Sequence, residues 1–347
     1  MNTTDAKHPP DAAARDWKIF TDDGKPHDGL LSLPPPPPWR FAHEARVLTA
    51  PAEFGASAAA AEGERRRAEP YITTEAMRIA VNAALYLRRP LLLTGKPGTG
   101  KSTLVARVAH ELRLGSVLRW PINSRSTVRG GIYEYDAVGR LQSGLDNPPV
   151  GDYLKLGPLG TALMAQDWPR ALLIDEIDKS DLDFANDLLN VVEEGEFEIP
   201  ELRRLRESPV TVGDFEGKPA TIHEGRLRSG QFPFVVMTSN GEREFPAPFL
   251  RRCIRLRIDP PDAVQLEAIV RSHLTAHAHQ LDTDEIKRLI AAFIASQRDN
   301  LDVATDQLLN AVFLTVAMKD VHGRSFDAAE LASVRQQLLQ PLGEQAT

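Results

Sequence analysis

Short runs of mostly apolar residues recur along the middle of the chain, and polar residues or turn formers follow them. The runs at 91–94, 116–120, 171–174 and 234–237 are typical of buried strands. The segment 254–258 alternates apolar and basic residues, which predicts one more strand. Apolar residues at helical spacing predict amphipathic helices between these strands. The predicted faces are Ile79, Ala80, Ala83, Ala84 and Leu87; Leu104, Val105, Val108, Ala109 and Leu112; and Leu182, Ala185, Leu188, Leu189 and Val192.

Polar residues mark where several helices begin. Thr73 or Thr74 is expected to cap the helix before the first strand, and another helix is expected to start near Pro158. The sequence 180–183, Ser-Asp-Leu-Asp, has the form of a capping box. Asp262 with Gln265 can cap a helix that follows two prolines.

Two polar stretches interrupt the pattern of strands and helices. In residues 121–156, the run 132–138 with a turn at Gly139 predicts a projecting hairpin. In residues 195–232, alternation at 209–212 and 220–223 predicts a second hairpin. From 262 to 340 the chain is expected to be a small helical bundle. Its apolar stripes are Ile286, Leu289, Ile290, Phe293 and Ile294; Leu308, Leu309, Val312, Phe313 and Val316; and Leu331, Val334 and Leu338.

Residues 1–70 do not have the pattern of a folded domain. Five prolines at 34–38 favour a stiff polyproline II rod, and Ala56–Ala68 is either a short helix or a disordered link. The segment is therefore either a flexible tail or an arm that docks on a neighbouring surface. The composition favours the first interpretation. The residues that suggest the second are the aromatic and apolar ones around the prolines: Trp17, Ile19, Phe20, Trp39 and Phe41. We expect domains at 1–70 (the arm, largely extended or disordered), 71–260 and 261–347.

A glycine-rich loop follows the first predicted strand and opens a helix. It matches the phosphate-binding pattern G-x-x-x-x-G-K-[ST] in full, a pattern whose glycines let backbone N–H groups face phosphate oxygens. Lys101 can reach the β- and γ-phosphates, and the Ser102 hydroxyl can bind Mg²⁺. The candidate nucleotide-binding residues are Gly95, Lys96, Pro97, Gly98, Thr99, Gly100, Lys101, Ser102 and Thr103.

Polar side chains end two of the other predicted strands. Asp175 and Glu176 follow the run 171–174, and this pair after a phosphate loop is typical of a metal ligand and a general base, respectively. Asn240 ends the run 234–239, where its amide could contact the γ-phosphate or the attacking water. Ser102 and Asp175 are thus the candidate Mg²⁺ ligands.

Two adjacent arginines, Arg251 and Arg252, precede the last predicted strand. They are suited to contact the nucleotide of a neighbouring subunit, where an arginine stabilises the charge of the phosphoryl-transfer transition state. A surface ion pair is the alternative for both residues. His273, His277 and His279 favour a solvated helix face over a metal site, because no carboxylate or cysteine completes a ligand set nearby.

Composition limits the class of protein. The chain has 347 residues, and its hydrophobic content of 42% is typical of a globular protein. Its net charge of −7 argues against a dedicated nucleic-acid binder. It has one cysteine, so no disulfide can form within the chain and a reducing cytoplasm is expected. No apolar run approaches the ~20 residues that span a bilayer, and the N-terminus lacks an apolar signal core.

The order of these motifs resembles the AAA+ ATPases and, among them, the MoxR family. The points that carry the resemblance are Gly95–Ser102, Leu172–Glu176 and the sequence 238–240, Thr-Ser-Asn. It implies an α/β P-loop NTPase core, with a five-stranded parallel sheet of order 5-1-4-3-2, β-hairpin insertions and an all-α lid. It also implies that Asn240 is the first sensor and that Arg252 is the arginine finger, with Arg251 in reserve.

The resemblance further implies activity, cofactors and partners. We expect an ATPase that uses ATP and Mg²⁺ at subunit interfaces of a ring, a hexamer, and that remodels a partner protein in a chaperone-like way. The partner could carry a von Willebrand factor A domain. A nucleic-acid motor of the same fold and a slow nucleotide-gated scaffold are the alternatives. Two departures from the family are the lack of an arginine at 303–307 and the position of Cys253, where an aromatic residue commonly follows the finger.

Overall fold

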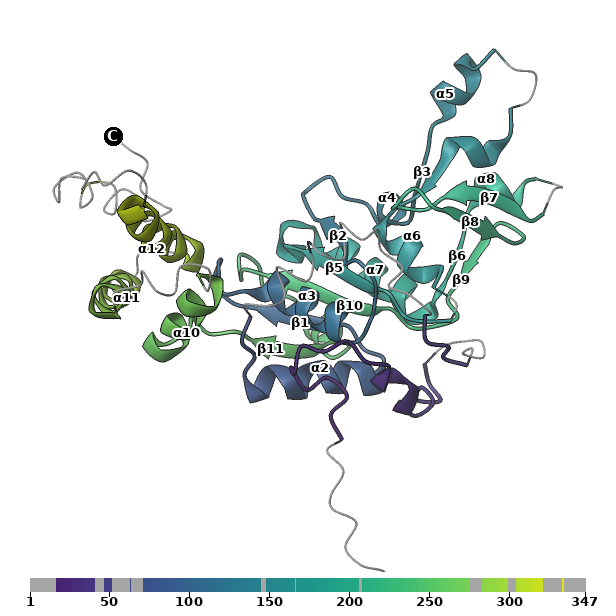
Figure 1. Cartoon of the computed structure of the whole chain (residues 1–347). Helices are drawn as coiled ribbons and strands as arrows, with labels where there is room; N and C mark the ends of the chain where they lie inside the picture. The colour runs from purple at the N-terminus through teal and green to yellow at the C-terminus, as the bar shows by residue number, and fades with distance from the viewer. Residues whose placement is uncertain are drawn as a thin grey trace, which may run out of the picture.

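A five-stranded parallel sheet forms the centre of the protein (Figure 1). The structure is a computed structural model and describes residues 17–40, 47–51, 63, 71–144, 148–165, 167–205, 208–274, 283–298, 304–320 and 333. The strands are β1 (Leu91–Thr94), β2 (Leu118–Pro121), β5 (Ala171–Asp175), β10 (Phe234–Ser239) and β11 (Ile254–Arg257). Their order is β11-β1-β10-β5-β2, which confirms the expected AAA+ P-loop NTPase sheet and its strand order.

Successive residues of these strands belong to two different cores. Leu91 and Leu93 of β1 pack on one face, whereas Leu92 packs on the other. The first face is covered by α2 (Glu75–Leu87) and α3 (Lys101–Glu111), and the second by α6 (Pro158–Leu163) and α7 (Leu182–Glu194). A sheet covered on both sides explains why its strands are almost wholly apolar.

Several details of the helices differ from the sequence-based expectation. Leu182, predicted on the apolar face of α7, is exposed because it lies in the first turn, before the buried face begins at Phe184. Thr74 caps α2 as predicted, but Ile79 and Leu87 are exposed, and the buried face instead includes Val81. Helix α2 has apolar residues on more than one side, so spacing alone could not select the side that packs. Asp181 caps α7 by accepting from the N–H of Phe184, and no capping box forms.

The two insertions join into one small sheet at one end of the molecule (Figure 1). The predicted hairpin β7 (Val210–Gly213) and β8 (Pro219–Ile222) is confirmed, and β7 pairs with β4 (Leu154–Leu156), which in turn pairs with β3 (Tyr133–Tyr135). The expected turn at Gly139 is wrong. Gly139 lies in α5 (Ala137–Gln142), because the Asp136 side chain accepts its N–H at 2.7 Å and starts a helix.

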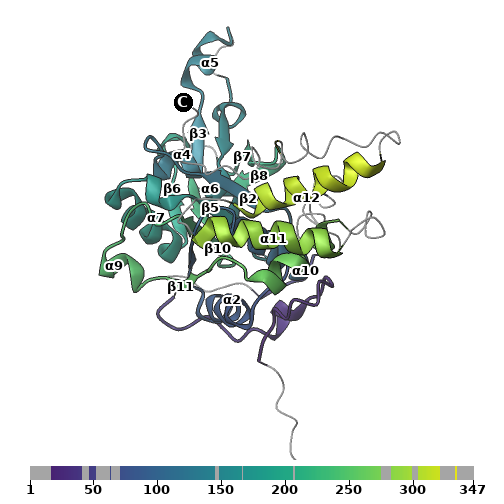
Figure 2. The ribbon, with the colours of Figure 1, turned by 90° about the vertical axis from the view of Figure 1, so that its left-hand side faces the viewer.

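Several short elements lie between these strands and helices or before them. They are η1 (Gly29–Ser32), α4 (Val128–Ile132), η2 (Val150–Tyr153), η3 (Ile177–Lys179), β6 (Glu196–Glu198), α8 (Pro200–Arg203), β9 (Arg226–Arg228) and α9 (Ala247–Leu250). Helix α9 packs against α7 (Figure 2).

Among the described residues, three helices form a lid with its own core at the other end of the molecule (Figures 1 and 2). They are α10 (Ala263–His273), α11 (Thr283–Arg298) and α12 (Thr305–Asp320), and Asp262 with Gln265 forms the predicted capping box of α10. Phe313 is exposed rather than buried. The predicted stripe Leu331, Val334 and Leu338 lies outside the described residues, as do His277 and His279. No helix of the described residues could cross a membrane.

The described part of the N-terminal segment packs against α2 and α3 of its own chain. Phe20 and Leu30 are fully buried, and the buried Asn82 side chain binds the backbone of Ile19 and Phe20. Of the segment 56–68, only residue 63 is described. Residues 17–40 contain η1, a turn at 38–39 and no strand, and they lie beside α2 (Figure 1).

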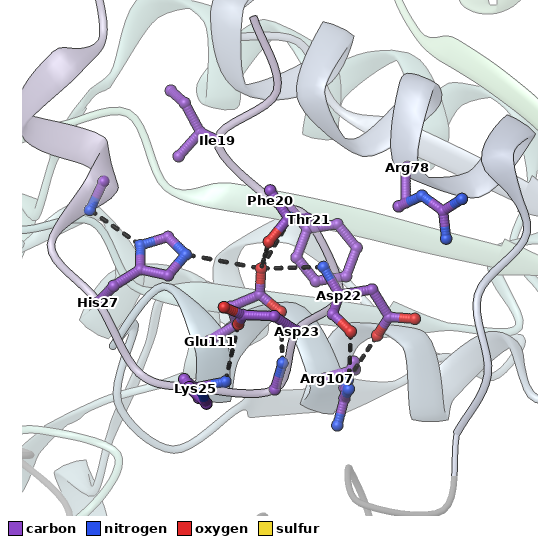
Figure 3. Close-up of polar contacts among 12 residues, drawn as sticks. Ile19, Phe20, Thr21, Asp22, Asp23, Lys25, His27, Arg78, Arg107 and Glu111 are labelled. Atoms are coloured by element: carbon purple, nitrogen blue, oxygen red, sulfur yellow. Dashed lines mark hydrogen bonds and ion pairs between the residues drawn. The ribbon is translucent and has the colours of Figure 1, made fainter. Parts of the chain in front are cut away.

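A buried carboxylate holds the backbone of this segment (Figure 3). Glu111, the last residue of α3, is inaccessible to solvent and accepts the N–H groups of Thr21 (2.7 Å), Asp22 (3.0 Å) and Gly24 (3.2 Å). Glu111 also faces the ring of His27. The Nδ1 atom of His27 accepts the N–H of Gly29, so the ring proton lies on Nε2, which points at Glu111. Buried acceptors paired with backbone donors make this a specific contact.

Candidate active site

A cavity of about 640 Å³ opens where the carboxyl ends of the parallel strands meet the lid. Its walls come from the glycine-rich loop after β1, the start of α2, the end of β11 and the start of α12. Open α/β sheets place ligands at this edge, because the loops that follow the strands converge there. The cavity contains most of the residues that the sequence singled out.

The glycine-rich loop needs its glycines for conformation and for space. Gly98 and Gly100 have φ values of 73° and 82°, in the left-handed region. A Cβ on Gly98 would lie 2.6 Å from the Cβ of Ala304, and one on Gly100 would lie 2.6 Å from the ring of Tyr71. The loop is therefore packed between the lid and the residues before α2.

The side chain of Lys101 points back into the glycine-rich loop, which ends at this residue. Its Nζ donates to the carbonyl oxygens of Gly95 (2.6 Å) and Lys96 (2.9 Å) and to Oδ1 of Asn240 (2.9 Å). Burial lowers the pKa of its ammonium group, although Asp175 and neighbouring carboxylates act in the opposite direction. The lysine thus bridges the loop and the end of β10.

Oxygen atoms of three side chains converge at the end of β5. The Asp175 Oδ1 accepts from the hydroxyl of Thr238 at 2.5 Å and from that of Ser102 at 3.4 Å. A hydroxyl beside a carboxylate is the oxygen donor set that Mg²⁺ prefers. Ser102 and Asp175 therefore fit the predicted metal site.

Glu176 has an unusual backbone and two side-chain partners. Its φ of 59° is left-handed, which is strained for a residue other than glycine and is often found at functional sites. Its Oε1 accepts from Nδ2 of Asn240 at 3.3 Å, and its Oε2 pairs with Nζ of Lys179 at 2.5 Å. The hydrogen bond to Glu176 raises the pKa of Lys179.

Asp178 is a site residue that the sequence did not single out. It is buried, and its Oδ2 accepts the backbone N–H of Asn240 (2.9 Å) and of Glu242 (3.0 Å). This contact fixes the backbone of Asn240 after β10. A third acid two residues after Glu176 was the available signal.

Other residues of the cavity were also missed by sequence reasoning. Tyr71 and Thr305 line it, and so does Arg257 at the end of β11, whose guanidinium pairs with Asp259 at 3.0 Å. Burial raises the pKa of Tyr71 far above its usual value. Their sequence context carried no motif, because only the fold brings these segments to the loop.

Arg251 and Arg252 lie away from this cavity, at the end of the sheet where the parallel strands begin. Strand β11 is parallel to β1 with Ile254 opposite Leu91, so the two arginines precede the strand at the edge opposite the glycine-rich loop. The Nε of Arg252 donates to Glu193 Oε2 (2.9 Å), and its Nη2 donates to Asn190 Oδ1 (2.8 Å). Arg251 is exposed. Cys253 is buried, which raises the pKa of its thiol to about 12.

The match to a family model agrees with the fold. Residues 90–253 match the family model of the AAA domain (dynein-related subfamily). Domain III of the replication initiation protein DnaA from Thermotoga maritima is similar in structure, with 16% identity and a TM-score of 0.45; the match covers 80% of this chain and 98% of that one. No curated protein matches the chain. The family match supports an AAA+ ATPase, and it does not extend to the MoxR subfamily.

Proposed function

We propose that this protein is a MoxR-like ATPase that hydrolyses ATP with Mg²⁺ between the subunits of a hexameric ring and remodels a partner protein. The observation that carries the proposal is the convergence of Lys101, Asp175 and Asn240 on one cavity beside a complete phosphate loop. Phosphoryl transfer needs little from a protein beyond positioning and charge stabilisation, and these residues offer both.

In this proposal the glycine-rich loop and Lys101 bind the β- and γ-phosphates. The carbonyl oxygens that Lys101 now contacts are replaced by phosphate oxygens when nucleotide enters. Ser102 and Asp175 would hold Mg²⁺, which would supply positive charge against the phosphates. Asn240 stays within reach of both Lys101 and Glu176, so it can sense the γ-phosphate.

Glu176 orients and deprotonates the attacking water. Its carboxylate now pairs with Lys179, a contact that must open for Glu176 to accept a proton. A general base must lie within hydrogen-bond reach of its water, and the Asn240 amide holds Glu176 at the mouth of the cavity. Activation in this proposal therefore breaks the ion pair between Glu176 and Lys179.

Arg252 acts on the nucleotide of a neighbouring subunit. The strand β11, with a rise of about 3.3 Å per residue, separates it from the phosphate loop of its own chain. A finger supplied by another molecule is worth ~10³–10⁵ in rate. Arg251 is the reserve candidate because it is exposed at the same end of α9.

Features of the insertion support a protein partner over nucleic acid. Val138 and Leu141 of α5 are exposed at the tip of the insertion, at the opposite end of the molecule from the lid (Figure 1). Two basic residues there are engaged within the chain: Arg129 pairs with Glu201, and Arg140 donates to the Pro148 carbonyl oxygen. A partner with a von Willebrand factor A domain follows from the MoxR resemblance alone.

The first experiment measures nucleotide binding with a fluorescent ATP analogue. We expect Lys101→Ala to lose binding, whereas Lys287→Ala, on the exposed surface of the lid, keeps wild-type affinity. Unchanged affinity in Lys101→Ala would overturn the assignment of the loop. A turnover rate that rises on adding DNA would favour a nucleic-acid motor.

The second experiment tests action between subunits. Glu176→Gln and Arg252→Ala should each bind nucleotide without turnover, and mixing the two proteins should restore activity, because some interfaces then combine an intact Glu176 with an intact Arg252. Wild-type turnover of Arg252→Ala alone would exclude it as the finger. Glu176→Gln protein loaded with ATP is also the bait with which to capture the partner.

A further inference from the structure

The carboxylate of Glu193, in the last turn of α7, is shared by two arginines from distant parts of the chain. Its Oε2 accepts from Arg252, whereas its Oε1 accepts from Nη1 of Arg40 at 2.9 Å. Arg40 belongs to the N-terminal segment, directly after the proline run and Trp39. Its side chain is only 6% exposed, so this contact is built into the fold rather than a surface ion pair.

Two contacts of the proline run hold Arg40 in place. The carbonyl oxygen of Pro34 accepts from Nη2 of Arg88 at 3.0 Å, and the N–H of Arg40 donates to the carbonyl oxygen of Pro37 at 2.8 Å. Upstream, Glu111 fixes the backbone at 21–24. A stiff proline run anchored in this way delivers Arg40 to one position.

The charges of this cluster determine how Arg252 is presented. Two guanidinium groups share one carboxylate, so the cluster keeps a net positive charge. Burial raises the pKa of Glu193, but hydrogen bonds from Arg252 and Arg40 outweigh it and lower the pKa, which keeps the carboxylate ionised. Within the described residues, Nε and Nη2 of Arg252 have partners and Nη1 has none, so Nη1 is available to a neighbour.

We propose that Arg40 is a positioning residue for the arginine finger: by occupying one oxygen of Glu193, it prevents that carboxylate from binding Arg252 through both oxygens. A bidentate arginine–carboxylate pair is stronger and fixes the guanidinium more tightly than contact with one oxygen. Without Arg40, Glu193 neutralises Arg252 and holds it within its own subunit. This inference rests on the proposed role of Arg252 in turnover.

The test compares turnover and nucleotide affinity in Arg40→Ala, Arg40→Lys and Arg40→Ala/Glu193→Gln. We expect Arg40→Ala to keep the nucleotide Kd within about twofold and to lose kcat by about 10- to 100-fold, the effect of a misplaced catalytic group. Arg40→Lys should recover part of this loss because it restores a cation beside Oε1. The double variant should recover more, since a neutral amide cannot neutralise Arg252. Arg204→Ala, an exposed arginine on the same domain, is the matched control.

The outcomes separate this inference from the proposed function. If Arg252→Ala abolishes turnover while assembled Arg40→Ala keeps wild-type kcat, Arg40 has no positioning role. If the double variant is as slow as Arg40→Ala, the loss does not pass through Glu193 and the inference is also refuted. If Arg252→Ala itself keeps full turnover, the finger assignment fails first. Sedimentation of each variant with nucleotide confirms assembly, and Arg40→Lys carries the test if Arg40→Ala does not assemble.

Discussion

The contact between Glu111 and the N-terminal segment gives a prediction whose size can be worked out from the structure. Substituting Glu111→Gln keeps the shape of the side chain but replaces one carboxylate oxygen by an NH₂ group. In either orientation of the amide, this group faces at least one backbone N–H among those of Thr21, Asp22 and Gly24 (Figure 3). That donor loses its acceptor in a partly buried place.

The cost follows from typical hydrogen-bond energies. A buried donor without a partner costs about 1–3 kcal/mol, and the remaining bonds lose about half of their about 1.5–3 kcal/mol each when the acceptor becomes neutral. We therefore expect Glu111→Gln to destabilise the docked segment by about 3–5 kcal/mol. At 1.4 kcal/mol for each factor of ten, amide exchange in residues 19–24 should speed up by at least about a hundredfold.

Hydrogen exchange followed by mass spectrometry measures this change peptide by peptide. Peptides from β5 and β10 in the central sheet should exchange as in the wild type, because they make no contact with Glu111. The matched control is Glu194→Gln, an exposed carboxylate at the end of α7, which should leave the N-terminal peptides unchanged. Unaltered exchange of residues 19–24 in Glu111→Gln would refute the view that this carboxylate holds the segment.

Three further predictions concern the loop, the cysteine and the acid limit of stability. Gly98→Ala should weaken nucleotide binding in a titration because its Cβ collides with Ala304, whereas Gly217→Ala, with a similar positive φ and open space around it, should not. Cys253 should resist a maleimide at pH 8 in the native protein and react after unfolding, because its thiol, with a pKa of about 12, stays protonated. The pKa of Glu193 is lowered in the folded protein, so its ionised carboxylate stabilises the fold above the unfolded pKa of about 4.3. Chemical denaturation of the wild type should show that this part of the free energy of unfolding is lost as pH falls through the folded pKa. The Glu193→Gln variant should not show that loss.

Local sequence was sufficient for the sheet and for most of the candidate site. The phosphate loop, the Asp175–Glu176 pair and Asn240 each follow an apolar run, and parallel strands bring their carboxyl ends to one edge. Because each motif lies within a few residues of its strand, the linear order predicted which side chains meet. The roles assigned to these residues stay predictions until the variants above are measured.

Sequence was weaker where polar residues pair over long distances. Asn82 and Glu111 stand on predicted helices as ordinary polar positions, and only the fold shows that both are buried against the backbone of the N-terminal segment. The turn predicted at Gly139 is a helix because a neighbouring aspartate caps it. Such choices depend on a partner that periodicity does not reveal.

The sequence by itself determined the α/β core, the strands and the position of the nucleotide loop, because hydrophobic periodicity and a contiguous motif are properties of neighbouring residues. Tertiary structure decided how the N-terminal segment is used. Arg40 and Glu193 are 153 positions apart, and Glu193 and Arg252 are 59 apart, so no local pattern links them. Their meeting depends on a partly buried carboxylate that cations from both ends of the domain stabilise.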